Sequence, residues 1–177
     1  DVSDRGSQPM VREAGRTRIV FNGEIYNFRE LRAALEQKGH TFRSGTDTEV
    51  ILALYQEYGR GLLSMLNGMF AFAIYDPERD EIFAARDRTG IKPLYYARLT
   101  DGGIAVSSEL KALLCLAGVD RRLDHDAIRD YLTYQFISDP RTPFLGVRRL
   151  PPGHSMRLHG ADLDLRCWFE GRPPDDG

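Results

Sequence analysis

The hydrophobic pattern predicts two amphipathic helices in the first third of the chain. Residues 27–30 (NFRE) and 46–49 (TDTE) each fit a capping box, in which the first side chain caps a helix and the fourth reaches back to the backbone. Apolar residues follow both boxes at helical spacing, and a glycine ends each segment. A short apolar strand is predicted at residues 17–21, and the Asn22-Gly23 pair after it indicates a sharp turn.

The middle of the chain changes to a strand-like period. Residues 70–74 alternate large and small side chains but are apolar on both faces, which suits a strand buried between two layers. Further strands are predicted at residues 82–85, 94–97 and 104–106, and their short connections suit antiparallel neighbours.

Helices are expected again toward the end of the chain. The pattern predicts them at residues 108–116 and 126–134, with Ser107 and Asp124 as caps. The proline- and glycine-rich tail that follows is predicted to be loop, with one short strand at residues 155–158. Strands covered by helices on their outer faces indicate a layered α+β domain.

Composition narrows the class of protein. The chain has 177 residues, 42% of them hydrophobic, and a net charge of -2 with its cations scattered, which argues against nucleic acid as a partner. It has no apolar run long enough to span a membrane and no leader pattern, so we expect a cytoplasmic protein without a membrane partner. The two cysteines and four isolated histidines predict no metal site, and Cys115, in an apolar run, is expected to be buried.

Two segments contain side chains that could do chemistry. The Asn22 amide and the Gly23 N–H are two neutral donors that could converge on one oxygen, as an oxyanion site requires, although an Asn-Gly pair is more often a simple turn. Asp47 lies in the first turn of a predicted helix, where its carboxylate is stabilised by the dipole or could face a ligand ammonium group. The charged segment around Arg86 and Lys92 could line a domain contact, but local surface ion pairs are the commoner arrangement.

Six blocks of sequence together carry a family resemblance. They are VFNGEIYNFRELR, SGTDTEVILALYQEYG, LNGMFAFAIYD, ARDRTGIKPLYYA, SSELKALL and RRLPPGH. In order and spacing they resemble the glutaminase domain of glutamine-dependent asparagine synthetases, which are class II glutamine amidotransferases of the N-terminal-nucleophile hydrolase fold. The resemblance implies a four-layer αββα sandwich of antiparallel sheets, incomplete at its N-terminus. It also implies a truncated amidotransferase domain at residues 1–150 and a linker toward a synthetase domain at residues 151–177.

The resemblance also implies roles for individual residues. Asn22 and Gly23 would form the oxyanion hole, and Glu24 and Asp47 would contact the substrate L-glutamine, with Asp47 taking its α-amino group. The nucleophile, an N-terminal cysteine, is expected upstream of this chain, so the chain alone is expected to be inactive. The domain itself would need no metal or other cofactor, whereas ATP and Mg would act in the synthetase domain, its partner in the same parent chain. A homo-oligomer is left open.

Two functions fit this resemblance. The first is a glutaminase that supplies ammonia to an ATP-dependent synthetase, which converts aspartate to asparagine. The alternative is a non-catalytic scaffold domain of a related synthetase, such as a β-lactam synthetase-like protein. The NGE and TDTE segments favour the enzyme, because a scaffold has no need of an oxyanion pair. A cysteine directly after the initiator methionine of the parent would decide between them.

Overall fold

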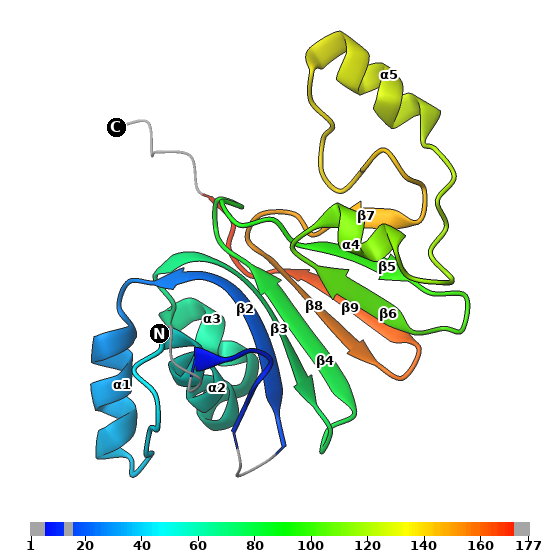
Figure 1. The fold of residues 1–177 in the computed structure, drawn as a ribbon. Coiled ribbons are helices and arrows are strands. Elements are labelled where there is room, and N and C mark those ends of the chain that lie inside the picture. The colour runs from blue at the N-terminus through cyan, green and yellow to red at the C-terminus, as the bar shows by residue number, and fades with distance from the viewer. Residues whose placement is uncertain (1–5, 13–15, 172–177) are drawn as a thin grey trace, which may run out of the picture.

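The computed structural model describes residues 6–12 and 16–171, which form two antiparallel sheets (Figure 1). The larger sheet has six strands in the order β1-β2-β3-β4-β8-β9, and the smaller has three in the order β6-β5-β7. The strands are β1 (Met10–Val11), β2 (Arg18–Ile25), β3 (Gly68–Asp76), β4 (Glu81–Arg86), β5 (Tyr95–Arg98), β6 (Ile104–Ser107), β7 (Val147–Arg149), β8 (His154–His159) and β9 (Asp162–Cys167).

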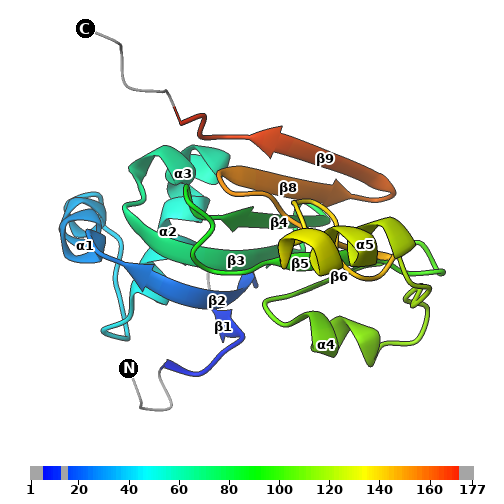
Figure 2. The same cartoon turned by 90° about the horizontal axis from the view of Figure 1, so that it is seen from above.

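Helices cover the outer faces of both sheets. The helices are α1 (Phe28–Gln37), α2 (Asp47–Tyr58), α3 (Leu62–Met65), α4 (Leu110–Leu114) and α5 (His125–Tyr134), with a 3-10 turn, η2 (Gly59–Gly61), before α3. Figures 1 and 2 show α1, α2 and α3 on one side of the large sheet and α4 beside the small sheet. None of the helices in the described ranges is long and apolar enough to cross a membrane.

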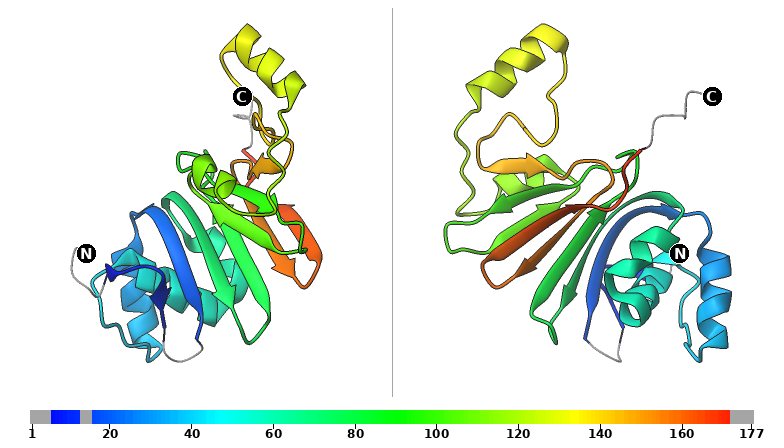
Figure 3. Two further views of the ribbon diagram at one scale, coloured as in Figure 1. Left: turned by 45° about the vertical axis from the view of Figure 1, so that its right-hand side comes forward. Right: turned by 180° about the vertical axis from the view of Figure 1, so that it is seen from behind.

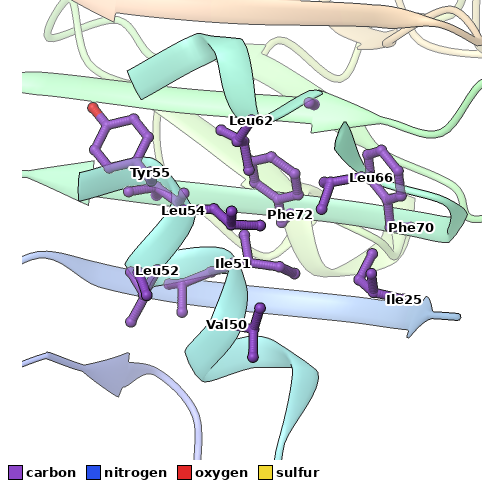
Figure 4. Close-up of a cluster of buried hydrophobic side chains, with 14 of the residues drawn as sticks. Ile25, Val50, Ile51, Leu52, Leu54, Tyr55, Leu62, Leu66, Phe70 and Phe72 are labelled. Atoms are coloured by element: carbon purple, nitrogen blue, oxygen red, sulfur yellow. The ribbon is translucent and has the colours of Figure 1, made fainter. Parts of the chain in front are cut away.

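Three apolar clusters hold these layers together. The largest joins α2 and α3 to the large sheet, and Figure 4 shows Ile51, Leu54 and Leu62 packed around Phe72 in it. A second cluster, which includes Ala71, fills the space between the two sheets, and a third joins the small sheet to α4. The order helix, sheet, sheet, helix confirms the expected αββα sandwich of antiparallel sheets. Helix α5 stands away from these layers (Figure 3).

The expected turn at Asn22-Gly23 is wrong. Both residues lie inside β2, paired with Ala71 and Phe70 of β3. A glycine is needed in this strand because β3 approaches it very closely. A Cβ on Gly23 would lie 2.2 Å from the carbonyl oxygen of Met69. The glycine therefore serves a close strand contact rather than a turn.

The two expected capping boxes differ in outcome. In α2 the Thr46 hydroxyl accepts the Glu49 N–H at 3.2 Å, which confirms the cap, but the Glu49 side chain binds residues before the helix instead of reaching back to Thr46. In α1 the Asn27 side chain makes no capping bond at all. Asp124 caps α5 as expected, whereas the residue that precedes α4 is Glu109 and not Ser107.

The tail of the chain is more ordered than expected. Strand β8 pairs with β4 and β9 pairs with β8, so residues 154–167 extend the large sheet and are not a linker. The boundary expected at residue 150 therefore falls inside the folded domain. Cys115 also differs from expectation, because α4 ends at Leu114 and leaves the cysteine exposed.

Candidate functional site

The free edge of β2 carries the first part of the candidate site. The Phe21 N–H donates to Gln8 Oε1 at 2.6 Å, and the Ile25 N–H donates to Asp47 Oδ2 at 3.0 Å. Both donors point away from β3. Alternate residues of a strand direct their backbone groups to the same side, so Gly23, between these two, points its N–H to that edge as well.

The neighbouring strands leave this N–H unpaired. Gly23 lies opposite Phe70, but the Phe70 N–H and C=O are bound to Asp87 on the other side of β3. The register of β1 extends along β2 only over Arg18 and Ile19. Among the described residues, the Gly23 N–H therefore has no backbone acceptor and remains free to bind a ligand oxygen.

Asn22 and Glu24 project from the opposite face of β2 to the one that packs on the helices. Asn22 pairs with Ala71, which belongs to the cluster between the sheets, and both Asn22 and Glu24 are exposed. A cavity of about 270 Å³ opens beside Asn22, and its lining includes Gln8 and Ser107. The Asn22 amide is thus adjacent in sequence to the free Gly23 N–H and lies beside a space that a small ligand could enter.

Asp47 brings a carboxylate to the same edge. It is the first residue of α2 and is half-buried, and the partial positive charge of the helix N-terminus stabilises its negative charge. Its Oδ2 atom accepts the Ile25 N–H, whereas Oδ1 has no protein donor in the part of the chain that the structure describes. One carboxylate oxygen therefore fixes the side chain and the other is available to a cationic group.

A buried carboxylate fixes the approach to α2. Glu49 accepts the N–H groups of Arg43 and Ser44 at 3.0 and 2.7 Å, and the Ser44 hydroxyl at 2.6 Å. Burial raises the pKa of Glu49, but the hydrogen bonds from Ser44 and Arg43 and the charge of Arg12 outweigh it, so the pKa lies below its usual value. The loop before Asp47 is therefore built on an ionised Glu49.

Asn27 fixes the other end of the NGEIYN segment. Its Nδ2 atom donates to the Met65 carbonyl at 3.0 Å, and its Oδ1 atom accepts the Asn67 N–H at 3.1 Å. The Tyr26 N–H also donates to the Asn67 carbonyl at 2.8 Å. These bonds attach the segment after β2 to the segment before β3, and this explains why an amide stands here without capping α1.

The structure thus brings the four expected site residues, Asn22, Gly23, Glu24 and Asp47, to one end of β2. Their roles toward glutamine stay predictions. Neither cysteine lines the cavity beside Asn22, so a thiol for attack is not supplied there by this chain.

Sequence reasoning missed Gln8 and Glu49 as supports of the site. Gln8 holds both backbone groups of Phe21 from outside the sheet, and no periodic pattern marks such a residue. Glu49 is predicted to complete a helix cap, and only the fold of the preceding loop shows that its carboxylate instead accepts the N–H of Ser44.

The segment around Arg86 is not a set of surface ion pairs. Arg86 and Asp87 are 6% and 1% exposed. Asp87 accepts the N–H groups of Thr89, Ile91 and Lys92, which shapes the loop from within. These two residues therefore build the structure beneath the loop instead of presenting charge to a partner.

Comparison with known proteins agrees with this geometry. The glutamine amidotransferase domain model matches residues 1–169. Glutamine-hydrolyzing asparagine synthetase 1 of Bacillus subtilis is 39% identical over 168 residues, which are 94% of this chain and 26% of that protein. Asparagine synthetase 3 of the same organism is 36% identical over 155 residues, 85% of this chain and 25% of that protein. The chain therefore spans about a quarter of the length of these relatives.

A solved structure supports the fold. The glutamine phosphoribosylpyrophosphate amidotransferase of Bacillus subtilis superposes with a TM-score of 0.68 at 22% identity, over 97% of this chain and 34% of that one. This likeness confirms the expected N-terminal-nucleophile hydrolase fold. Because the family model matches almost every residue, the chain belongs to the glutamine amidotransferase domain family.

Proposed function

We propose that this domain hydrolyses the side-chain amide of L-glutamine and supplies the ammonia to a synthetase that makes asparagine. The observation that carries the proposal is the arrangement at the end of β2, which has the free Gly23 N–H and the Asp47 carboxylate at its edge and the exposed Asn22 amide on the adjacent face. The first two can stabilise a developing oxyanion, and the third can bind the α-ammonium group of glutamine.

The reaction needs little else from this chain. A cysteine thiolate from outside it would attack the amide carbon, so that a carbon–sulfur bond forms and the carbonyl oxygen takes up the negative charge. The Asn22 and Gly23 hydrogens would bind that oxygen. As the tetrahedral intermediate collapses, the amide nitrogen accepts a proton and leaves as ammonia, and water then hydrolyses the thioester to glutamate and the free thiol. ATP and Mg would serve only the synthetase that consumes the ammonia.

The test compares the two nitrogen donors in a hybrid synthetase. Residues 1–169 of this chain would replace the aligned stretch of Bacillus subtilis asparagine synthetase 1, which supplies the rest. We expect Asn22→Ala to lower glutamine-dependent synthesis by about 10²- to 10³-fold, because one oxyanion donor is lost. Ammonia-dependent synthesis should stay unchanged. Arg18→Ala, at an exposed position of β2 outside the lining of the cavity beside Asn22, is the control and should change neither rate.

Equal loss of both activities in Asn22→Ala would contradict the proposal. Full activity with both donors would contradict the role given to Asn22 as well, whereas a hybrid that makes asparagine from ammonia but never from glutamine would favour a scaffold role. If the hybrid makes no asparagine from either donor, nuclear magnetic resonance of the 177-residue chain replaces it. L-glutamine should then shift the Gly23 amide and the Asn22 side-chain amide, and no shift at either would count against the site.

A further inference from the structure

Helix α5 presents an apolar face to solvent. The half-buried Ile128 and the exposed Tyr131, Leu132 and Tyr134 lie on one side of the helix, and Phe136 follows its C-cap residue, Gln135. We call the five apolar residues the α5 face. The exposed fractions are 53% for Tyr131, 77% for Leu132, 73% for Tyr134 and 58% for Phe136. The polar residues of the helix occupy the other side, and Ala127 is its one buried residue. An apolar cluster of this kind marks an interaction site rather than a chance exposure.

The helix is held in place by polar contacts at its start and near its middle. A helix of 10 residues is marginal in water, so something other than its own sequence must fix it. The Asp124 side chain accepts the Ala127 N–H at 3.0 Å at the start, and Asp130 forms an ion pair with Arg141 further along. The α5 face is therefore preformed, although the helix hardly packs on the domain.

The segment that follows α5 is attached to the large sheet. Asp139 binds Arg86 at 3.1 Å and Arg149 at 2.9 Å, and Arg86 also donates to the Leu150 carbonyl at 2.8 Å. Arg86 of β4 pairs with Ala71 of β3, and Ala71 in turn pairs with Asn22 of β2. Two strand spacings, about 10 Å, therefore separate Arg86 from Asn22. The base of α5 is thus attached at the same end of the large sheet as the candidate site.

A hollow lies beneath the helix. A cavity of about 390 Å³ separates α5 from the small sheet, and its lining includes Ile128, Tyr131 and Phe136 of the α5 face together with Tyr95. The lining also includes Gln135 and Arg149, so an occupant must offer protruding apolar side chains together with polar groups for these two. Rigid positioning of the face lowers the entropy lost on binding such an occupant.

We infer that the α5 face is the docking surface for the synthetase part of the chain, an inference that rests on the proposed function. Two observations select this occupant over others. The relatives carry about three quarters of their length outside the stretch aligned to this chain. In such a protein the partner is covalently linked, and its effective concentration at the α5 face is high. The segment that follows α5 is also attached at the end of the sheet that holds the candidate site. Ammonia becomes the non-nucleophilic ammonium ion in water, so its consumer must be close to the site where it is released.

The test introduces a charge into the face. In the same hybrid synthetase, Leu132→Asp should separate the two parts, because a carboxylate would have to be buried against apolar groups. We expect the asparagine formed per glutamine hydrolysed to fall about tenfold, which is the effect of 1.4 kcal/mol. Glutaminase turnover and ammonia-dependent synthesis should persist. Thr133→Asp adds the same charge to the polar side of α5 and should behave as the parent does.

Two structural readouts separate this inference from the proposed function. Calorimetry should show one joint unfolding transition in the hybrid and in Thr133→Asp, and two transitions in Leu132→Asp. Hydrogen exchange at residues 125–134 should be slow in the first two proteins and fast in the third. Both measurements apply even if the hybrid hydrolyses no glutamine. Identical unfolding and exchange in Leu132→Asp and Thr133→Asp would overturn the inference, and so would a dimer that Leu132→Asp dissociates, since the face would then bind a second copy.

Discussion

At the scale of single residues, Gly23 satisfies two requirements at one position. Its φ of +153° and the 2.2 Å between a Cβ there and the Met69 oxygen exclude any side chain. The same residue offers the free N–H of the candidate oxyanion site. A glycine that is already needed for strand contact therefore also lets a ligand approach the backbone, and its structural role and its proposed catalytic role do not exclude each other.

The steric role can be tested on the chain itself. Gly23→Ala should lower the free energy of unfolding by about 1–3 kcal/mol more than Gly102→Ala does. This difference is the usual energetic cost of overpacking a tight site. Gly102 has a positive φ of 90°, but a Cβ at that position would meet no atom within 4 Å, so this control isolates the backbone strain. Urea denaturation monitored by fluorescence measures both. Equal losses would mean that β3 moves away at little cost.

The residues of the site could be found from the sequence, but their arrangement could not. Asn22, Gly23 and Asp47 stand out by chemical type, and their segments carry the family resemblance. Only the hydrogen bond from Ile25 to Asp47 shows that α2 begins at the edge of β2. Such a contact joins residues 22 positions apart, and no local pattern encodes that distance.

At the scale of elements, the N-terminus of α2 depends on an ionised carboxylate. Glu49→Gln should lower the free energy of unfolding by about 1–3 kcal/mol at pH 7, because the part-buried N–H of Arg43 and the buried N–H of Ser44 lose a charged acceptor. The folded-state pKa of Glu49 lies below 4.5, so its contribution is present above pH 4.5 and is lost as pH falls through the folded-state value. The difference between the two proteins should therefore shrink below pH 4.5.

Urea titrations from pH 7 to pH 3.5 measure this difference. Glu36→Gln is the control, because it loses only an exposed ion pair with Arg32 and should stay within about 0.5 kcal/mol of the wild type. A gap between wild type and Glu49→Gln that is constant with pH would show that shape, and not charge, holds the loop.

Elements with a strong local signal were predicted, and those defined by tertiary pairing were not. The helix at α2 and the buried strand β3 have clear periodicity and agree with expectation. Strand β9 has no buried residue and lies in the proline- and glycine-rich tail, so it was expected to be loop. It is a strand because β8 offers a partner along its whole length.

At the scale of the whole molecule, Arg86 joins segments that are far apart in the sequence. It stands on β4 of the large sheet, and its guanidinium donates to the carbonyls of Gly90, Lys92 and Leu150 as well as to Asp139. Those acceptors lie at the two ends of the segment that contains the small sheet. One buried cation therefore adds polar contacts to the apolar cluster that joins the two sheets, and it also binds the segment that follows α5.

Removing this cation should loosen the molecule at that junction. Arg86→Met keeps most of the apolar stem but leaves three carbonyls without their donor and Asp139 with Arg149 alone, and we expect a loss of about 3–5 kcal/mol in the free energy of unfolding. Arg98→Met removes an exposed arginine with one bond, at 3.4 Å to Ala161, and should cost less than about 1 kcal/mol. Thermal denaturation gives the global loss, and limited proteolysis within residues 135–150 gives the local one. Equal melting temperatures in the two variants would show that apolar packing alone fixes the sheets. A large loss of stability confined to Arg86→Met, with early cleavage after α5, would show that this side chain is needed to hold them in their relative position.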